Sequence, residues 1–200
     1  MEEKTFLIEG DSALVRTFAK SYEWYTPLKY IRAVREVLGQ IDLDPASCEL
    51  ANQVVQARSY YDIQTDGLAH DWSGRVYLNP PYGRIGHISN QEIWIKRLIE
   101  QYKAGRTTEA ILLVNASTDT GWFQHLWEYP ICLTDHRVNF WSRDGGQGST
   151  HGSAFVYFGE HESLFIDVFS EFGPVFPSGV VVRKQREASP SLWSSMEVSA

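Results

Sequence analysis

Two consecutive prolines directly after a short apolar run impose the strongest constraint on how this chain folds. Arg75 to Leu78 has the composition of a buried strand, and Asn79 separates it from Pro80 and Pro81. Proline has no N–H to donate to a neighbouring strand, so sheet pairing has to stop at this point. The strand therefore ends on a polar side chain held in a stiff loop, which is a place where chemistry is expected.

Short apolar runs of this kind recur along the chain. They are rich in aliphatic and aromatic residues, as buried strands of a parallel sheet are. In chain order, the predicted strands are Ile41 to Asp44, Arg75 to Leu78, Ala110 to Asn115, Ile131 to Leu133, Val138 to Trp141 and Ala154 to Phe158.

Between these runs the apolar residues follow helical spacing. The first helix has Thr26 as its cap, Pro27 in its first turn and Gly39 as its stop. The later predicted helices are Cys48 to Arg58, Gln91 to Tyr102, Asp119 to Glu128 and Glu162 to Phe172. The alternation predicts an α/β fold with a doubly wound, mainly parallel sheet and helices on both faces. In such sheets ligands bind at the carboxyl ends of the strands.

The length of 200 residues fits one such domain. We predict that the domain covers residues 21–182, preceded by an arm or helix over residues 1–20. The Ser-rich residues 183–200 are predicted to form a disordered tail. Cys48 and Cys132 match no metal or redox spacing, so we expect free thiols, no disulfide and no zinc.

The net charge of −7 weighs against a protein that binds nucleic acid by covering phosphates broadly. A nucleic-acid enzyme of this charge needs its basic residues in local clusters. No apolar run is long enough to cross a bilayer, and the acidic start does not fit a secretory signal, so we expect a cytoplasmic protein. The candidate clusters are Arg32 with Arg35, Arg84 with His87, Lys96 with Arg97, and Arg137 with Arg143.

The string Asn79 to Tyr82 is suited to chemistry on a planar amine such as the N6 amino group of adenine. The lone pair of this nitrogen is delocalised into the ring, so the site has to accept its protons while the nitrogen becomes tetrahedral. The Asn79 side-chain oxygen and the Pro80 carbonyl supply two fixed acceptors. Tyr82 offers a flat face on which an extruded base can stack.

This string matches the Asn-Pro-Pro-Tyr signature of amino-methyltransferases, and Tyr25 to Phe176 resembles the phage-type DNA N6-adenine methyltransferase (Dam) family. The resemblance implies a Rossmann-like class I methyltransferase fold and S-adenosylmethionine as the cofactor. It also implies double-stranded DNA with a flipped adenine as the substrate, and a phage or prophage gene expressed in a bacterial cell. The implied catalytic residues are Asn79, Pro80, Pro81 and Tyr82.

Three further segments resemble cofactor-contacting segments of that family. They are Trp24 to Pro27, the first strand with its turn over Ile41 to Ser47, and the acidic segment at Asp66 to Leu68. Charge and reach assign Asp44 to the methionine ammonium and Asp66 to the adenine amino group. The first turn lacks the glycines of related enzymes, and Glu49 and Asp62 are the candidates for the ribose-binding acid. The implied cofactor contacts are Tyr25, Thr26, Pro27, Asp44, Pro45, Ala46, Ser47 and Asp66.

DNA recognition is expected from loops, because no inserted recognition domain is visible. One is Gly83 to Asn90 and the other is Arg137 to Gly152, where bases, flat rings and glycines combine. The predicted DNA contacts are Arg84, His87, Arg137, Arg143 and His151.

Two alternatives remain open at the level of sequence. The same fold and cofactor serve enzymes that methylate an RNA base or the amide of a protein glutamine, since these substrates also present a planar nitrogen. The missing glycines and the acidic charge also fit a nucleic-acid-binding module without turnover.

Overall fold

The computed structural model describes residues 24–142, 147–148 and 151–180. The arm predicted over residues 1–20 and the tail predicted over residues 183–200 lie outside these ranges. None of the helices in the described ranges has the length and apolar character that crossing a bilayer requires.

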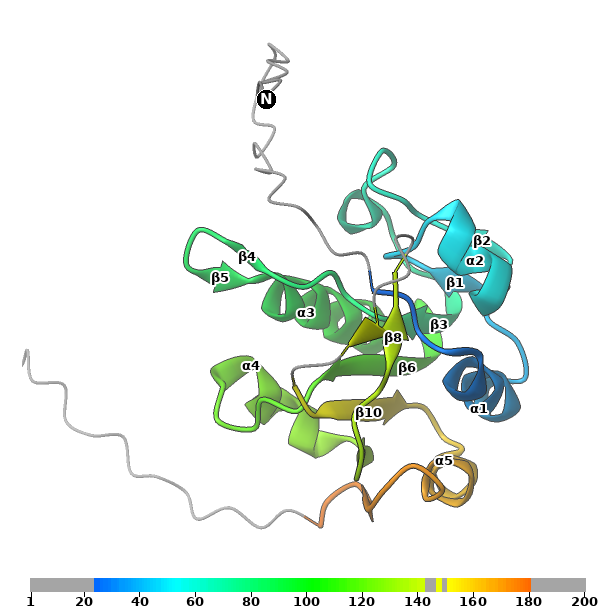
Figure 1. Cartoon of the computed structure of the whole chain (residues 1–200), viewed down its shortest axis with the longest axis vertical. Helices are drawn as coiled ribbons and strands as arrows, with labels where there is room; N and C mark the ends of the chain where they lie inside the picture. Colours follow the sequence, from blue (N-terminus) through cyan, green and yellow to red (C-terminus); the bar gives the residue numbers. More distant parts are fainter. Residues whose placement is uncertain (1–23, 143–146, 149–150, 181–200) are drawn as a thin grey trace, which may run out of the picture.

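A seven-stranded sheet forms the centre of the domain (Figure 1). Its strand order is β11-β7-β10-β6-β3-β1-β2. The prediction of a mostly parallel sheet is confirmed, because β7, β6, β3, β1 and β2 run in one direction, while β10 and β11 run in the other. These strands are β1 (Leu43–Asp44), β2 (Ser59–Tyr60), β3 (Gly74–Leu78), β6 (Thr107–Asn115), β7 (Ile131–Leu133), β10 (Ser153–Phe158) and β11 (Val175–Phe176).

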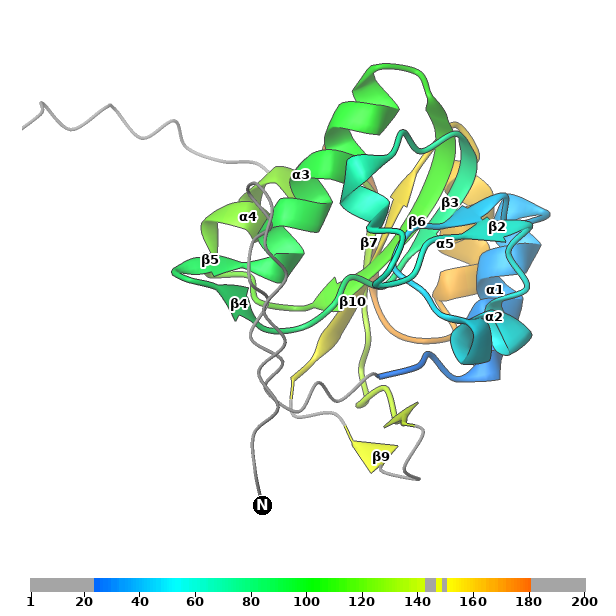
Figure 2. The ribbon, with the colours of Figure 1, turned by 90° about the horizontal axis from the view of Figure 1, so that it is seen from above.

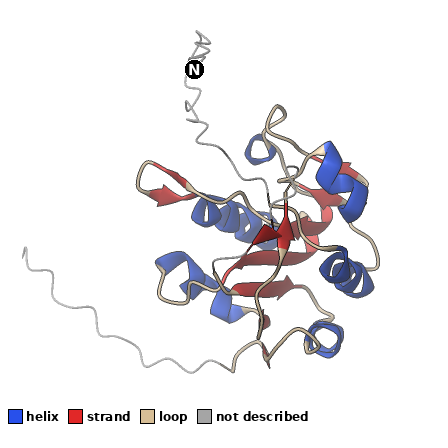
Figure 3. Cartoon of the chain, in the orientation of Figure 1, coloured by secondary structure: helices blue, strands red, loops and turns tan. Residues whose placement is uncertain are grey.

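Helices cover both faces of this sheet (Figure 3). One face packs on α1 (Leu28–Leu38), α2 (Glu49–Val55) and α5 (Glu162–Phe169). The other packs on α3 (Asn90–Lys103), α4 (Gly121–Gln124) and the 3-10 helix η2 (His125–Glu128). Strand β6 supplies both cores because successive side chains point to opposite faces. Its residues Ile111 and Leu113 lie in the first core, and Leu112 and Val114 lie in the second.

The start of α1 differs from the prediction. Pro27 is the N-cap of the helix, and its carbonyl accepts hydrogen bonds from the N–H groups of Tyr30 and Ile31. Thr26 lies one residue too early to cap the helix, and its hydroxyl instead contacts Tyr77 Oη at 2.7 Å. The predicted cap and first-turn positions are therefore wrong by one residue, because the Thr26 side chain faces the sheet.

Two small hairpins lie outside the main sheet. The predicted loop Gly83 to Asn90 contains β4 (Arg84–Ile85) and β5 (Ile88–Ser89). The predicted strand Val138 to Trp141 is shorter, since only β8 (Phe140–Trp141) is a strand, and it pairs with β9 (Gln147–Gly148) instead of joining the main sheet. Figure 2 shows both hairpins on the side of the domain at which β3 and β6 end.

The turn after β1 and the 3-10 helix η1 (Gly67–Ala69) approach each other closely. A Cβ atom placed on Gly67 would lie 2.0 Å from the Pro45 carbonyl oxygen. Only glycine therefore allows these two backbones to meet. The Trp72 indole N–H fixes the same turn by donating to the Gly67 carbonyl at 2.7 Å.

Gly67→Ala is predicted to force this turn away from Pro45 and to lower the free energy of unfolding by about 2 kcal/mol or more, the scale of overpacking in a rigid site. Chemical denaturation measures the change. Gly121→Ala is the matched control, because nothing lies within 4 Å of the added Cβ in α4. Equal stability of the two variants would contradict the close approach.

Candidate active site

The polar residues predicted from the strand ends meet at one edge of the sheet. Parallel strands end at the same edge, and β1 and β3 are neighbours with Leu43 opposite Val76. Asp44 at the end of β1 and Asn79 just after β3 therefore lie on adjacent strand ends. The segment Trp24–Pro27 passes over this edge and is joined to β8 by the backbone bridge between Tyr25 and Trp141.

The Asn79 side chain is held from one side only. Its Nδ2 atom donates to the Trp24 carbonyl at 3.1 Å and to Thr26 Oγ1 at 3.4 Å. Its Oδ1 atom is buried and has no hydrogen-bond partner among the residues that the structure describes. The Trp24 carbonyl can only accept a hydrogen bond, so the amide nitrogen has to face it and the oxygen has to face the other way. The site thus contains a fixed, desolvated acceptor without a donor.

The loop after Asn79 is fixed by the first residue of α3. The Asn90 backbone N–H donates to the Gly83 carbonyl at 3.0 Å, and Asn90 Nδ2 donates to the Tyr82 carbonyl at 3.1 Å. Pro80 is buried and Pro81 is exposed. The Tyr82 ring contacts Phe140 edge-on with a centroid separation of 6.2 Å. Burial raises the pKa of Tyr82 well above its usual value, so the phenol stays neutral.

The Asp44 carboxyl group is buried from solvent. It is 3% exposed, and burial raises its pKa to about 7, although the nearby Ser47 hydroxyl and the Ala46 N–H, 3.2 Å from Asp44 Oδ1, lower it in part. No Lys, Arg or His side chain within the described ranges forms an ion pair with it. An unpaired carboxylate of this kind is stabilised by any cation that binds beside it.

The segments predicted to contact the cofactor converge on this edge. Pro45 lies against Gly67, which follows Asp66, and the Ser47 N–H donates to the Tyr61 carbonyl at 2.9 Å. Asp66 has a left-handed backbone, and its side chain accepts a hydrogen bond from the Leu68 N–H at the start of η1. Ser47 Oγ is also buried, and among the described residues it forms no hydrogen bond of good geometry, although it lies close enough to Asp44 to lower the pKa of that carboxyl group.

Three site residues were not predicted from the sequence. Cys48 caps α2, accepts from the Ala51 N–H at 3.4 Å and lies 3.5 Å from Tyr25 Oη. Asn90 fixes the loop after Tyr82. Tyr77 reads as a core residue of a strand, and only its hydroxyl contact with Thr26 places it in the site.

The predicted DNA contacts fall into two groups along this edge. Arg84 and His87 are exposed on the β4–β5 hairpin, where the Arg84 guanidinium donates to the His87 carbonyl at 3.0 Å. Arg137 and His151 are exposed near the start of β10. Arg143 lies outside the described residues.

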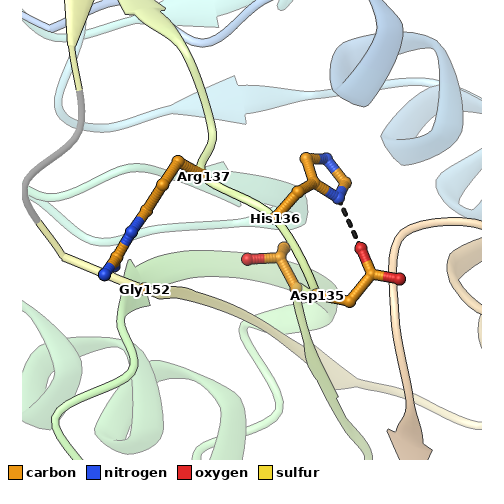
Figure 4. A pocket seen from close by; sticks show the side chains of 5 residues that line it. Asp135, His136, Arg137 and Gly152 are labelled. Atoms are coloured by element: carbon orange, nitrogen blue, oxygen red, sulfur yellow. Dashed lines mark hydrogen bonds and ion pairs between the residues drawn. The ribbon is translucent and has the colours of Figure 1, made fainter.

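Arg137 borders an open hollow of about 370 Å³ (Figure 4). The Arg137 side chain extends toward Gly152, and His136 turns the other way to meet Asp135. His136 Nδ1 lies 2.6 Å from Asp135 Oδ1, and its Nε2 lies 2.7 Å from Tyr30 Oη. Both ring nitrogens are thus occupied, and the contact with Tyr30 attaches this loop to α1.

The mixed α/β architecture, with a mostly parallel central sheet and helices, fits a methyltransferase-like fold. A comparison with protein-family models matches residues 17–160 to the family described as DNA N-6-adenine-methyltransferase (Dam), and the chain belongs to this family. Membership confirms the resemblance found in the sequence and implies DNA adenine N6-methyltransferase activity, a transferase reaction with DNA as substrate. A search of curated proteins and a search of solved structures found no match.

Asp44→Asn is predicted to stabilise the protein at pH 8. The folded pKa of about 7 lies above the ordinary 3.8, so the folded state retains a proton that the unfolded state loses. The wild type therefore loses stability as the pH rises from about 4 to 7, by a few kcal/mol in order of magnitude. Asparagine cannot ionise and avoids this loss. Chemical denaturation at pH 8 and pH 4 measures the difference in free energy of unfolding between Asp44→Asn and wild type. A difference that does not shrink toward pH 4 would contradict the raised pKa of Asp44.

Proposed function

We propose that the protein transfers a methyl group from S-adenosylmethionine to the N6 amino group of an adenine flipped out of double-stranded DNA. The observation that carries this proposal is the buried Asn79 Oδ1, an oriented acceptor that has no donor among the residues the structure describes. Leaving such an acceptor unpaired is costly, and an amino group of the substrate would satisfy it. Family membership supports the adenine of DNA as the source of that group.

The chemistry needs acceptors in place and no strong base. Asn79 Oδ1 and the Pro80 carbonyl would accept the two amino hydrogens while positive charge develops on the nitrogen. Because the Asn79 amide is held by Trp24 and Thr26, the acceptor is oriented before the substrate arrives. Tyr82 stays neutral, and we propose that its ring stacks on the extruded base.

The residues at the strand ends fit S-adenosylmethionine. This cofactor supplies a methyl group on a sulfonium, and it carries an ammonium group as well. We propose that Asp44 binds the ammonium, because its carboxyl group is buried without a cation among the described residues. Asp66 is proposed to bind the adenine amino group. Tyr25, Thr26, Pro27, Pro45, Ala46 and Ser47 line the same edge in this proposal, and the sheet is then a Rossmann-like class I methyltransferase sheet.

DNA would reach this edge over the two hairpins. We propose that Arg84, His87, Arg137, Arg143 and His151 contact the DNA, with the β4–β5 hairpin and the loop around β9 on its two sides. A small group of basic side chains beside the site is consistent with a net charge of −7, because a chain of this charge does not attract phosphate over its whole surface.

Wild-type protein is expected to transfer labelled methyl from S-adenosylmethionine to unmethylated DNA, with N6-methyladenine identified by mass spectrometry. Asn79→Ala should lower kcat by about a hundredfold or more, the usual effect of removing an oriented transition-state contact. Cofactor binding by Asn79→Ala is the control for folding. If label appears only in RNA or in a protein glutamine, that molecule and not DNA is the methyl acceptor. If the protein binds the cofactor and labels nothing, a binding module without turnover is favoured.

Cofactor affinity is expected to rise with pH. Asp44 has to be ionised to pair with an ammonium, and its pKa is about 7. The affinity should therefore rise roughly tenfold per pH unit below pH 6 and level off near pH 7. Asp44→Asn should bind weakly at every pH. Calorimetric titration between pH 5 and pH 7 measures this, and a flat wild-type profile would remove Asp44 from the cofactor site.

A further inference from the structure

We propose that the Tyr77 hydroxyl is a positioning group for methyl transfer, which orients the Asn79 amide by holding the segment Trp24–Pro27 against the end of β3. The inference rests on the proposed function of Asn79. Tyr77 would act without touching either substrate.

Tyr77 lies on β3, two residues before Asn79. Its side chain is 1% exposed and belongs to the core under α1. Only its hydroxyl reaches the site, where Tyr77 Oη and Thr26 Oγ1 are 2.7 Å apart. Burial and the nearby Asp44 and Tyr82 raise the pKa of Tyr77 well above its ordinary value, so the hydroxyl stays protonated.

Both acceptors of the Asn79 amide lie on the segment that Tyr77 holds. These acceptors are the Trp24 carbonyl and Thr26 Oγ1. Thr26 Oγ1 has two lone pairs and one hydrogen, so it can accept from Asn79 and share a hydrogen bond with Tyr77 in either direction. The Tyr25–Trp141 bridge attaches the segment to β8, and the Tyr77 contact attaches it to β3, the strand directly before Asn79.

The orientation of this amide decides whether the site works. An asparagine side chain rotates easily about its last torsion, and a half turn exchanges its oxygen and nitrogen. After such a turn the Asn79 N–H groups would face the amino group of the base, and two donors would meet. The segment Trp24–Pro27 prevents this turn only while it stays within hydrogen-bond distance of Asn79. A tyrosine at position 77 supplies that constraint, and a phenylalanine would fill the same core volume without it.

The test compares Tyr77→Phe with the matched control Tyr157→Phe. Tyr157 is also fully buried, but its hydroxyl contacts Glu109 and the His161 N–H, near the end of β10 and far along the strand from the site edge. Tyr77→Phe should lower kcat by about tenfold to a hundredfold, in line with the effect of small misplacements in active sites. The KM for DNA should stay within about twofold of wild type. Tyr157→Phe should leave kcat unchanged.

A double-mutant cycle tests the route through Thr26. Thr26→Val removes the hydroxyl at similar size, together with the hydrogen bond that it accepts from Asn79. Adding Tyr77→Phe to this variant should lower kcat no further, because Tyr77 acts through this hydroxyl. Thr26→Ser should restore most of the rate. Additive losses, a rise in KM with kcat unchanged, or a wild-type kcat for Tyr77→Phe would each overturn the proposal.

A measurement without turnover separates this inference from the proposed function. The side-chain amide resonances of Asn79 are assigned in nitrogen-edited NMR spectra by their loss in Asn79→Ala. They should shift or broaden in Tyr77→Phe and stay unchanged in Tyr157→Phe. If the wild type methylates no DNA and these resonances still shift, the function fails and the positioning holds. If they do not shift, the positioning is wrong whatever the activity.

Discussion

The structure of the site depends on a few hydrogen bonds between the segment Trp24–Pro27 and the end of β3. They join residues that are more than fifty positions apart in the sequence. On the strand side, the two prolines after Asn79 end the pairing and leave this side chain free of the sheet. On the segment side, the Trp24 carbonyl and the Thr26 hydroxyl determine which way the amide points. Neither side alone would orient the acceptor.

The same edge holds two features that do not stabilise the free protein. Asp44 is buried without a cation within the described part of the chain, and Asn79 Oδ1 is buried without a donor. Both carry a desolvation cost that the rest of the fold has to offset. The two cores on either side of β6 supply that stability. A site of this kind gains most from binding, because a ligand cation and a ligand amine relieve both costs at once.

Much of the fold could be predicted because strand ends carry local signals. The apolar runs and the proline pair placed β3, β6 and Asn79 correctly. The addition of β11 depends on its pairing with the distant strand β7, which no local pattern records. β8 pairs with β9 in a short hairpin, inside the segment Arg137 to Gly152 that the sequence predicted as a loop. The Thr26-Pro27 pair reads the same whether the threonine caps a helix or faces the sheet, so the sequence predicted Thr26 as a helix cap. Only the three-dimensional position of Tyr77 separates the two.

The charge of the chain adds a constraint on how DNA is bound. A net charge of −7 does not favour broad attraction to phosphate, so under the proposed function the attraction has to come from local basic residues beside the edge. Arg84 lies on the β4–β5 hairpin, and Arg137 lies in the segment before β8, beside Gly152. Attraction limited to these flanks would leave the middle of the edge to shape and hydrogen bonding. There, in the proposed function, Asn79 oriented through Thr26 and Tyr77 would accept the hydrogens of the adenine amino group.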